Sequence, residues 1–131
     1  MRVQIDGELD SIGDRVGQLS PVSLAYLGDA VYELYIRARY LWPPKRIADY
    51  HDRVVARVRA EQQAEDLARL EPYLTDSERD ILRRGRNAAT GKPRRLSTHT
   101  YRQATGMETL IGYLYLQDPA RLQDLLEKLE L

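Results

Sequence analysis

Apolar residues recur at helical spacing along most of this chain, and prolines separate the segments in which they do so. The first segment begins at Ser20-Pro21, where a capping oxygen precedes a proline suited to the first turn of a helix. It ends at Pro43-Pro44, and its apolar residues are Leu24, Leu27, Val31, Leu34, Tyr35, Ala38 and Leu41. No convincing alternation of period two, typical of strands, is present anywhere. We therefore predict an all-α fold with five or six main helices.

Two further helical segments occupy the middle of the chain. A long helical pattern runs from about Ile47 to Leu70, and Pro72 marks a boundary after it. The apolar face of this pattern consists of Val54, Val55, Val58, Ala64, Leu67 and Leu70. Residues 75–78 (Thr-Asp-Ser-Glu) match a capping box, which predicts a short helix ending near Asn87.

The last part of the chain contains a loop and two more helical patterns. Residues 89–98 include a glycine, a proline and three bases, a composition typical of a loop. Helical spacing resumes at Tyr101, and Asp118-Pro119 caps a last helix. At the other end, residues 1–19 hold few apolar residues and three glycines. We interpret residues 1–19 as a loosely ordered lead-in to one domain over residues 20–131.

The composition excludes several classes of site and partner. The chain has no cysteine, which rules out disulfide frameworks, thiolate zinc sites, iron–sulfur clusters and cysteine nucleophiles. Its 20 basic and 20 acidic residues cancel, so the net charge neither favours nor excludes a polyanionic partner. No apolar run approaches the roughly 18 residues of a membrane span, and no signal-peptide pattern is present. We expect a soluble, cytoplasmic domain without a membrane partner.

Two acids stand inside apolar helical segments, each beside glycine. Asp29 follows Gly28 directly, and Glu108 lies between Gly106 and Gly112 in the most apolar segment of the chain. One interpretation is structural: Gly28 permits close helix packing, Asp29 pairs with an arginine, and Glu108 faces solvent. The other is a magnesium site, because Mg²⁺ usually takes one or two protein carboxylates together with waters and substrate phosphates.

The residues around these acids resemble two motifs of the ribonuclease III catalytic domain. Residues 26–31 (Tyr-Leu-Gly-Asp-Ala-Val) resemble the signature motif, and residues 107–112 (Met-Glu-Thr-Leu-Ile-Gly) resemble the second motif. The matched region covers roughly residues 20–118. Residues 84–88 (Arg-Gly-Arg-Asn-Ala) and Tyr101-Arg102 are similar to the compact branch called Mini-ribonuclease III. In line with that branch, we expect no double-stranded-RNA-binding domain.

The resemblance implies an all-α homodimer that cuts both strands of duplex RNA, with one magnesium-dependent site in each subunit. Asp29 falls on the essential aspartate of the family, and Glu108 falls on the glutamate of the second motif. Two positions depart from the family: a glutamate is replaced by Ala25 and an aspartate by Thr105. The number of carboxylates at the site therefore drops from four to two. Glu33 is interpreted as a structural ion-pair partner.

The resemblance also implies a substrate class. Family members of the compact branch act on structured precursor RNA, notably the paired ends of large-subunit (23S) ribosomal RNA. Ribosomal proteins or the pre-ribosome are then further partners, and the process is ribosome biogenesis in the cytoplasm.

A basic stretch between residues 79 and 102 carries eight bases and a single acid, Asp80, so its local charge is +7. Duplex RNA is held mainly through its phosphates and its shape. Because the stretch is almost entirely basic, we favour RNA binding over a merely solvated charged face as its interpretation. The predicted RNA-binding residues are Arg84, Arg86, Asn87, Lys92, Arg94, Arg95, Tyr101 and Arg102. Asn87 either caps its helix or contacts a phosphate.

The remaining polar and aromatic candidates have plainer interpretations. His51 and His99 are either phosphate contacts or structural histidines, since a water activated by a metal needs neither of them. Tyr113 and Tyr115 alternate with leucine and are expected to pack in the core.

Two other classes of function compete with the nuclease. One is a non-catalytic duplex-RNA-binding module on the same fold, and the other is a helical scaffold for protein contacts. The presence of both Asp29 and Glu108 argues against the binding module, because a pure binder gains nothing from acids in apolar helices. The basic stretch argues against the scaffold.

Overall fold

The computed structural model describes residues 15–131, and this part of the chain contains six α-helices and no strand. The all-α prediction is confirmed. Most of the predicted lead-in over residues 1–19 lies outside the described residues. The described helices are α2 (Pro21–Tyr40), α3 (Ile47–Val58), α4 (Ala60–Leu70), α5 (Asp76–Ala88), α6 (Thr98–Gln117) and α7 (Pro119–Glu127).

Side-chain caps start the helices where the sequence indicated them. The Ser20 hydroxyl accepts a hydrogen bond from the Ser23 backbone N–H at 3.1 Å. Thr75 and Glu78 form a reciprocal capping box, with distances of 3.1 and 2.9 Å. These caps satisfy backbone donors that a helix cannot satisfy itself. The predicted loop ends at Ser97, which caps α6, so α6 begins slightly before the predicted Tyr101.

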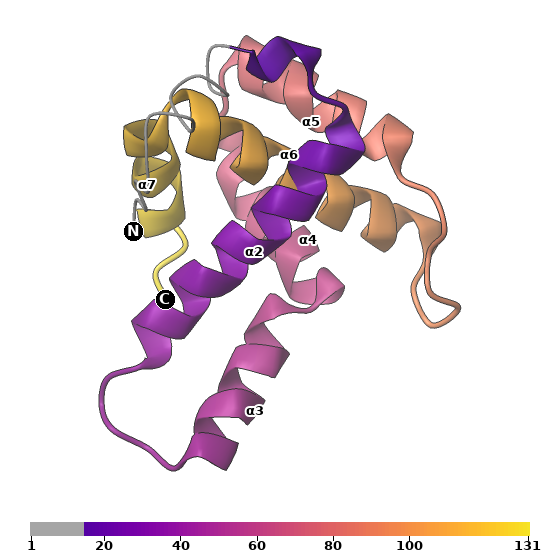
Figure 1. Ribbon diagram of the computed structural model, residues 1–131. Helices are drawn as coiled ribbons and strands as arrows, with labels where there is room; N and C mark the ends of the chain where they lie inside the picture. The colour runs from indigo at the N-terminus through magenta and orange to yellow at the C-terminus, as the bar shows by residue number, and fades with distance from the viewer. Residues whose placement is uncertain (1–14) are drawn as a thin grey trace.

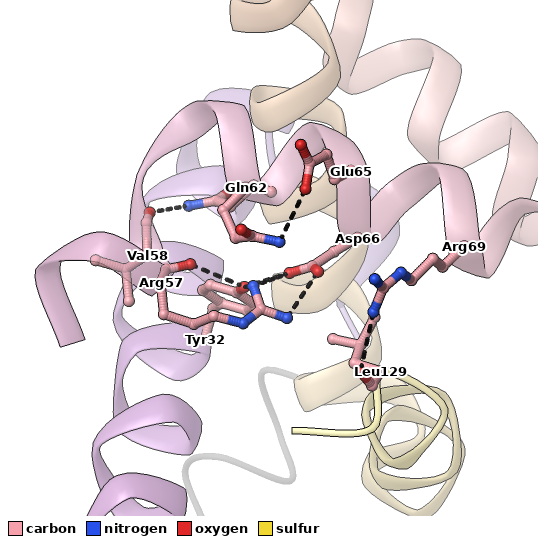
Figure 2. A network of polar contacts seen from close by, with 9 residues as sticks. Tyr32, Arg57, Val58, Gln62, Glu65, Asp66, Arg69 and Leu129 are labelled. Carbon is pink, nitrogen blue, oxygen red and sulfur yellow. Dashed lines mark hydrogen bonds and ion pairs between the residues drawn. The ribbon is translucent and has the colours of Figure 1, made fainter. Parts of the chain in front are cut away.

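The pattern from Ile47 to Leu70 is two helices, because the chain breaks at Arg59, whose ψ of 160° is extended. Polar side chains of α4 satisfy the end of α3: the Gln63 amide donates to the Val58 carbonyl oxygen at 2.9 Å. Arg57 donates twice to the Asp66 carboxylate, at 2.7 and 2.8 Å. Figure 2 shows the pair of Arg57 and Asp66 joining the two helices. Periodicity alone does not reveal such a break, because the apolar spacing continues across it.

The core lies around α6, which packs against α2, α4, α5 and α7 (Figure 1). Tyr32, Ile36, Leu67, Met107 and Leu126 are all fully buried in this core. The predicted apolar face of α2 is wrong in part. Leu34, Ala38 and Leu41 are exposed, and the buried residues of α2 are Leu24, Ala25, Gly28, Val31, Tyr32, Tyr35 and Ile36.

Two further predictions about packing have clear outcomes. Tyr113 and Tyr115 are half-buried against the core, as predicted. Val55, placed on the buried face of the second pattern, is 49% exposed because the break at Arg59 turns α3 away from α6. None of the helices in the described residues is long and apolar enough for a transmembrane span.

Candidate active site

Helices α2 and α6 touch backbone to backbone at two glycines. A Cβ atom built on Gly28 would lie 1.8 Å from the backbone carbonyl oxygen of Glu108. A Cβ atom built on Gly112 would lie 2.0 Å from the backbone carbonyl oxygen of Leu24. No side chain fits in either place, because real Cβ contacts are never this short. The glycines beside the two acids therefore allow the two helices to meet.

This close crossing brings Asp29 and Glu108 together. The pKa of the Glu108 carboxyl is raised to about 8. Burial is the largest cause, followed by the hydrogen bond with Asp29 and the negative charge of Asp29. A hydrogen bond from Gln63 acts in the opposite direction. The negative charge of Asp29 repels that of an ionised Glu108, and a cation bound between the two side chains would remove this repulsion.

The paired acids line an open cleft with a volume of about 240 Å³. Ala25 and Thr105, the two positions at which the resemblance implies acids, line the same cleft. The other residues of the wall belong to α2, to the end of α5, to the segment after it and to the start of α6: Val22, Tyr26, Ala88, Ala89, Thr90 and Tyr101. All four positions at which the resemblance implies carboxylates therefore line one cleft.

The donor set in this cleft is small. Among residues 15–131, no cluster of three or more histidine, cysteine, aspartate or glutamate side chains is arranged to hold a metal ion. The two carboxylates are suited to a cation that keeps most of its own water molecules, which is how Mg²⁺ commonly binds to proteins.

Part of the predicted RNA-binding set gathers beside the cleft, at the end of α5 and the start of α6. Arg102 donates to the Asn87 side-chain oxygen at 2.9 Å and to the Arg86 backbone oxygen at 3.0 Å. Arg86 donates to the side chain of Gln103 at 3.1 Å. These residues line a hollow of about 500 Å³ together with Arg83, Thr98 and His99. Asn87 is thus held by Arg102 rather than acting as a helix cap.

The rest of the predicted RNA-binding set is more widely spread. Arg84 is exposed on α5, and Lys92, Arg94 and Arg95 are exposed on the loop between α5 and α6. That loop is fixed at its end by Leu96, which is 7% exposed. The Tyr101 hydroxyl donates to the Thr90 backbone oxygen at 2.8 Å and ties the loop to α6.

The charge of the basic stretch is not wholly free. Arg95 pairs with Glu61 of α4 at 3.1 Å, and Arg83 pairs with Asp80 of its own helix. Both pairs are solvent-exposed, and exposed pairs are worth little and exchange readily for other partners. Away from this stretch, Glu33 pairs with Arg37 at 3.0 Å, as predicted. His51 is exposed, lines a separate hollow with that pair and does not line the cleft.

Sequence reasoning missed Gln63 and the buried ion pair between Arg57 and Asp66. Gln63 is 3% exposed and interacts with the Glu108 carboxyl. The Asp66 side chain is fully buried, and it accepts a short hydrogen bond from the Tyr32 hydroxyl. A signal for both was present: positions 63 and 66 lie on the same helical face as Leu67 and Leu70.

Comparison with known proteins agrees with this geometry. Residues 22–119 match the family model described as the ribonuclease III domain. The Mini-ribonuclease 3 of Synechocystis sp. is 61% identical over 116 residues, which are 88% of this chain and 81% of that protein. The Mini-ribonuclease 3 of Thermosynechococcus vestitus is 56% identical over 112 residues, which are 86% of this chain and 74% of that protein.

A solved structure shows the same fold. The crystal structure of a protein from Fusobacterium nucleatum matches with a TM-score of 0.76 at 30% identity, and the match covers 85% of this chain and 88% of that one. The resemblance seen in the two sequence motifs is therefore confirmed, along with the arrangement of the helices that carry them. The chain belongs to the ribonuclease III domain family and is an endoribonuclease.

Proposed function

We propose that this endoribonuclease cleaves double-stranded RNA and depends on magnesium, with Asp29 and Glu108 as the metal-binding and catalytic residues. One observation carries the proposal: the two acids meet at the crossing of α2 and α6 and line an open cleft. The two carboxylates suit Mg²⁺, because a cation between them would offset their mutual repulsion. Two protein ligands also leave most of the coordination sphere of Mg²⁺ to water and phosphate. When bound there, Mg²⁺ would lower the pKa of a water molecule and offset charge on the scissile phosphate.

The residues of this chain would perform two tasks around that site. Asp29 and Glu108 hold the cation. The predicted RNA-binding residues hold phosphates on either side of the cut, since positive side chains supply most of the affinity for a nucleic acid duplex. Those residues are Arg84, Arg86, Asn87, Lys92, Arg94, Arg95, Tyr101 and Arg102. Tyr101 contributes to both tasks, because it lines the cleft and its hydroxyl also holds the basic loop through Thr90.

We further propose that the enzyme is a homodimer. Three large apolar side chains on α2 are exposed at positions four and eight residues apart: Val22 (58%), Tyr26 (85%) and Leu34 (44%). This spacing places them on one face of the helix, and an exposed apolar stripe is typical of an interface. Leu34→Arg should yield a monomer in sedimentation experiments, whereas Val55→Arg on α3 should leave the dimer intact. A monomeric wild type, or a dimeric Leu34→Arg variant, would contradict this assignment.

The substrate proposed for this activity is structured precursor RNA, in particular the paired ends of 23S ribosomal RNA. It is supported by the similarity to Mini-ribonuclease 3 proteins over more than four-fifths of the chain. Ribosomal proteins or the pre-ribosome in the cytoplasm would then be further partners.

The direct test is incubation of the wild-type protein with labelled duplex RNA, with magnesium and with a chelator, read on a denaturing gel. Cleavage of both strands with magnesium and none with chelator is expected. The alternative, a non-catalytic duplex-RNA-binding module, predicts a shifted complex on a native gel and intact strands on the denaturing gel under both conditions. Equal cleavage of single-stranded RNA would contradict the duplex substrate.

A further inference from the structure

Gln63 occupies an unusual position for a polar residue. It lies in the first turns of α4 and is 3% exposed. Its amide nitrogen donates to the Val58 carbonyl oxygen at 2.9 Å, but its side-chain oxygen Oε1 is buried and receives no hydrogen bond from any described residue. Leaving a buried acceptor unsatisfied costs roughly 1–3 kcal/mol. A residue needed only to cap α3 would not require that oxygen.

The fold also holds Gln63 rigidly in this place. One turn further along α4, Asp66 is fixed by two hydrogen bonds from Arg57 and by a short one from Tyr32. Figure 2 shows this network tying α4 to α3 and to Tyr32 of α2. Tyr32 itself lies one turn after Asp29 on α2. The network therefore fixes the helix bearing Gln63 to the helix bearing the first acid of the cleft.

Gln63 reaches the second acid directly. Helix α4 packs along α6, and the Gln63 side chain interacts with the carboxyl group of Glu108. An amide nitrogen has two hydrogens, so one can serve Val58 while the other serves Glu108. The unsatisfied Oε1 belongs to the same amide group and thus lies in the same polar neighbourhood.

We propose that Gln63 is a positioning residue of the metal centre: its amide N–H orients the Glu108 carboxylate, and its Oε1 accepts a hydrogen bond from the water shell of the bound cation. The inference rests on the proposed magnesium function. With only two carboxylates at the site, a bound Mg²⁺ retains several water molecules, and each of them needs acceptors. Residues that support metal ligands in this way typically change metal affinity 10–100-fold when replaced.

The test is metal binding, measured apart from cleavage. Mn²⁺, which can be followed by electron paramagnetic resonance, is titrated into the full-length protein and its variants without RNA. Gln63→Met keeps the size of the side chain but removes both hydrogen-bonding groups, and it should weaken Mn²⁺ binding by about 10–100-fold. Gln62→Met is the matched control, because Gln62 is a neighbour on α4 whose amide contacts Glu65 instead. It should bind Mn²⁺ like the wild type.

Melting in chelator separates this role from a merely structural one. Gln63→Met removes an unsatisfied buried oxygen along with the contact to Val58, so its melting temperature in chelator should stay close to that of the wild type. Gln63→Leu likewise removes both hydrogen-bonding groups without adding a charge, and it should weaken Mn²⁺ binding to a similar extent. If Gln63→Met does not fold, the proposal stands or falls with Gln63→Leu.

Three outcomes decide between the claims. Wild-type Mn²⁺ affinity in Gln63→Met, or in Gln63→Leu where Gln63→Met does not fold, would overturn the role of Gln63. Asp29→Asn, tested alongside, should abolish tight Mn²⁺ binding. If Asp29→Asn retains wild-type Mn²⁺ affinity, the proposed metal function fails. If Asp29→Asn loses Mn²⁺ affinity while Gln63→Met binds normally, only the role of Gln63 is overturned.

Discussion

Gly28 lies directly against the backbone carbonyl group of Glu108, with space for a hydrogen atom and for no side chain, since a Cβ atom there would be 1.8 Å from that oxygen. This contact sets the distance between the two helices that carry the acids. Asp29 follows Gly28 immediately, so any shift of the crossing moves one carboxylate relative to the other. Packing and chemistry thus depend on the same residue.

Gly28→Ala should therefore both destabilise the protein and reduce cleavage. The added methyl group meets backbone atoms that cannot rotate away, so the free energy of unfolding should fall by about 3 kcal/mol, at the upper end of overpacking effects. Urea denaturation measures this change. Gly17→Ala is the control, because nothing lies within 4 Å of a Cβ atom at position 17, and it should change the free energy of unfolding by less than about 0.5 kcal/mol. Equal stabilities for the two variants would argue against the tight crossing.

Stability without metal should depend on pH through Glu108. Its pKa is raised from 4.5 to about 8 in the folded protein, so the folded state binds a proton more tightly than the unfolded state does. The stability contributed by this proton is complete below about pH 4.5 and is lost as the pH rises to about 8. Melting of wild type and Glu108→Gln in chelator from pH 5 to 9 isolates the effect. The wild type should lose stability relative to Glu108→Gln as the pH rises. The reverse trend would contradict the raised pKa of Glu108 in the folded protein.

Restoring the missing carboxylates should make the metal more important to stability. Ala25 and Thr105 line the cleft with the two acids, so Ala25→Glu with Thr105→Asp would place four carboxylates in one space. Like charges repel there, and the double variant should melt below the wild type in chelator. Magnesium should then raise its melting temperature by more than it raises that of the wild type. An equal rise in both proteins would mean that positions 25 and 105 do not face the metal.

A control distinguishes the cleft from the general effect of added acids. Ala56 is exposed on α3, outside the cleft. Ala56→Glu should leave both the melting temperature in chelator and the rise with magnesium near their wild-type values.

The exposed bases of the loop should determine the salt dependence of duplex binding. Within residues 15–131, no acid forms an ion pair with Lys92 or Arg94, whereas Arg95 pairs with Glu61. Each phosphate contact contributes about 0.9 to the slope of log affinity against log salt concentration, with duplex DNA as the guide. Replacing both residues by alanine should flatten the slope by about 2 for each protomer bound. Lys128→Ala, at the end of α7 on the opposite side of the molecule (Figure 1), should not change it.

An unchanged slope in the Lys92 and Arg94 variant would place the RNA elsewhere on the surface. A slope changed equally by Lys128→Ala would show that the binding responds to net charge rather than to this loop.

The sequence predicted most of the helices well, and for local reasons. Caps such as Thr75 with Glu78 are encoded within four residues, and a glycine beside an acid in an apolar helix indicates a close crossing. The break at Arg59 was missed because the apolar spacing runs through it. It depends on contacts between the two resulting helices, as from Arg57 to Asp66. Long-range polar partners of this kind have no periodic signature.

The same reason explains why Gln63 was missed. A glutamine in a charged segment such as residues 57–66 resembles a solvated residue. Its place on the helical face of Leu67 and Leu70 indicates burial, but only tertiary packing shows that Glu108 lies beside it. Likewise, the exposure of Leu34 depends on which side of α2 packs against α6. The apolar surface of α2 is broad, so helical spacing alone does not determine that side.

Asp29→Asn tests the central claim most directly, because it preserves the shape of the side chain and removes the charge that would hold the metal. The measurement is single-turnover cleavage of a labelled RNA duplex in magnesium, with duplex affinity measured in chelator, and with Asp52→Asn on α3 as the control. Cleavage by Asp29→Asn should fall by about two orders of magnitude or more, while its duplex affinity and both properties of Asp52→Asn stay at wild-type values. Cleavage by Asp29→Asn at a rate near that of the wild type would contradict the assignment of the active site.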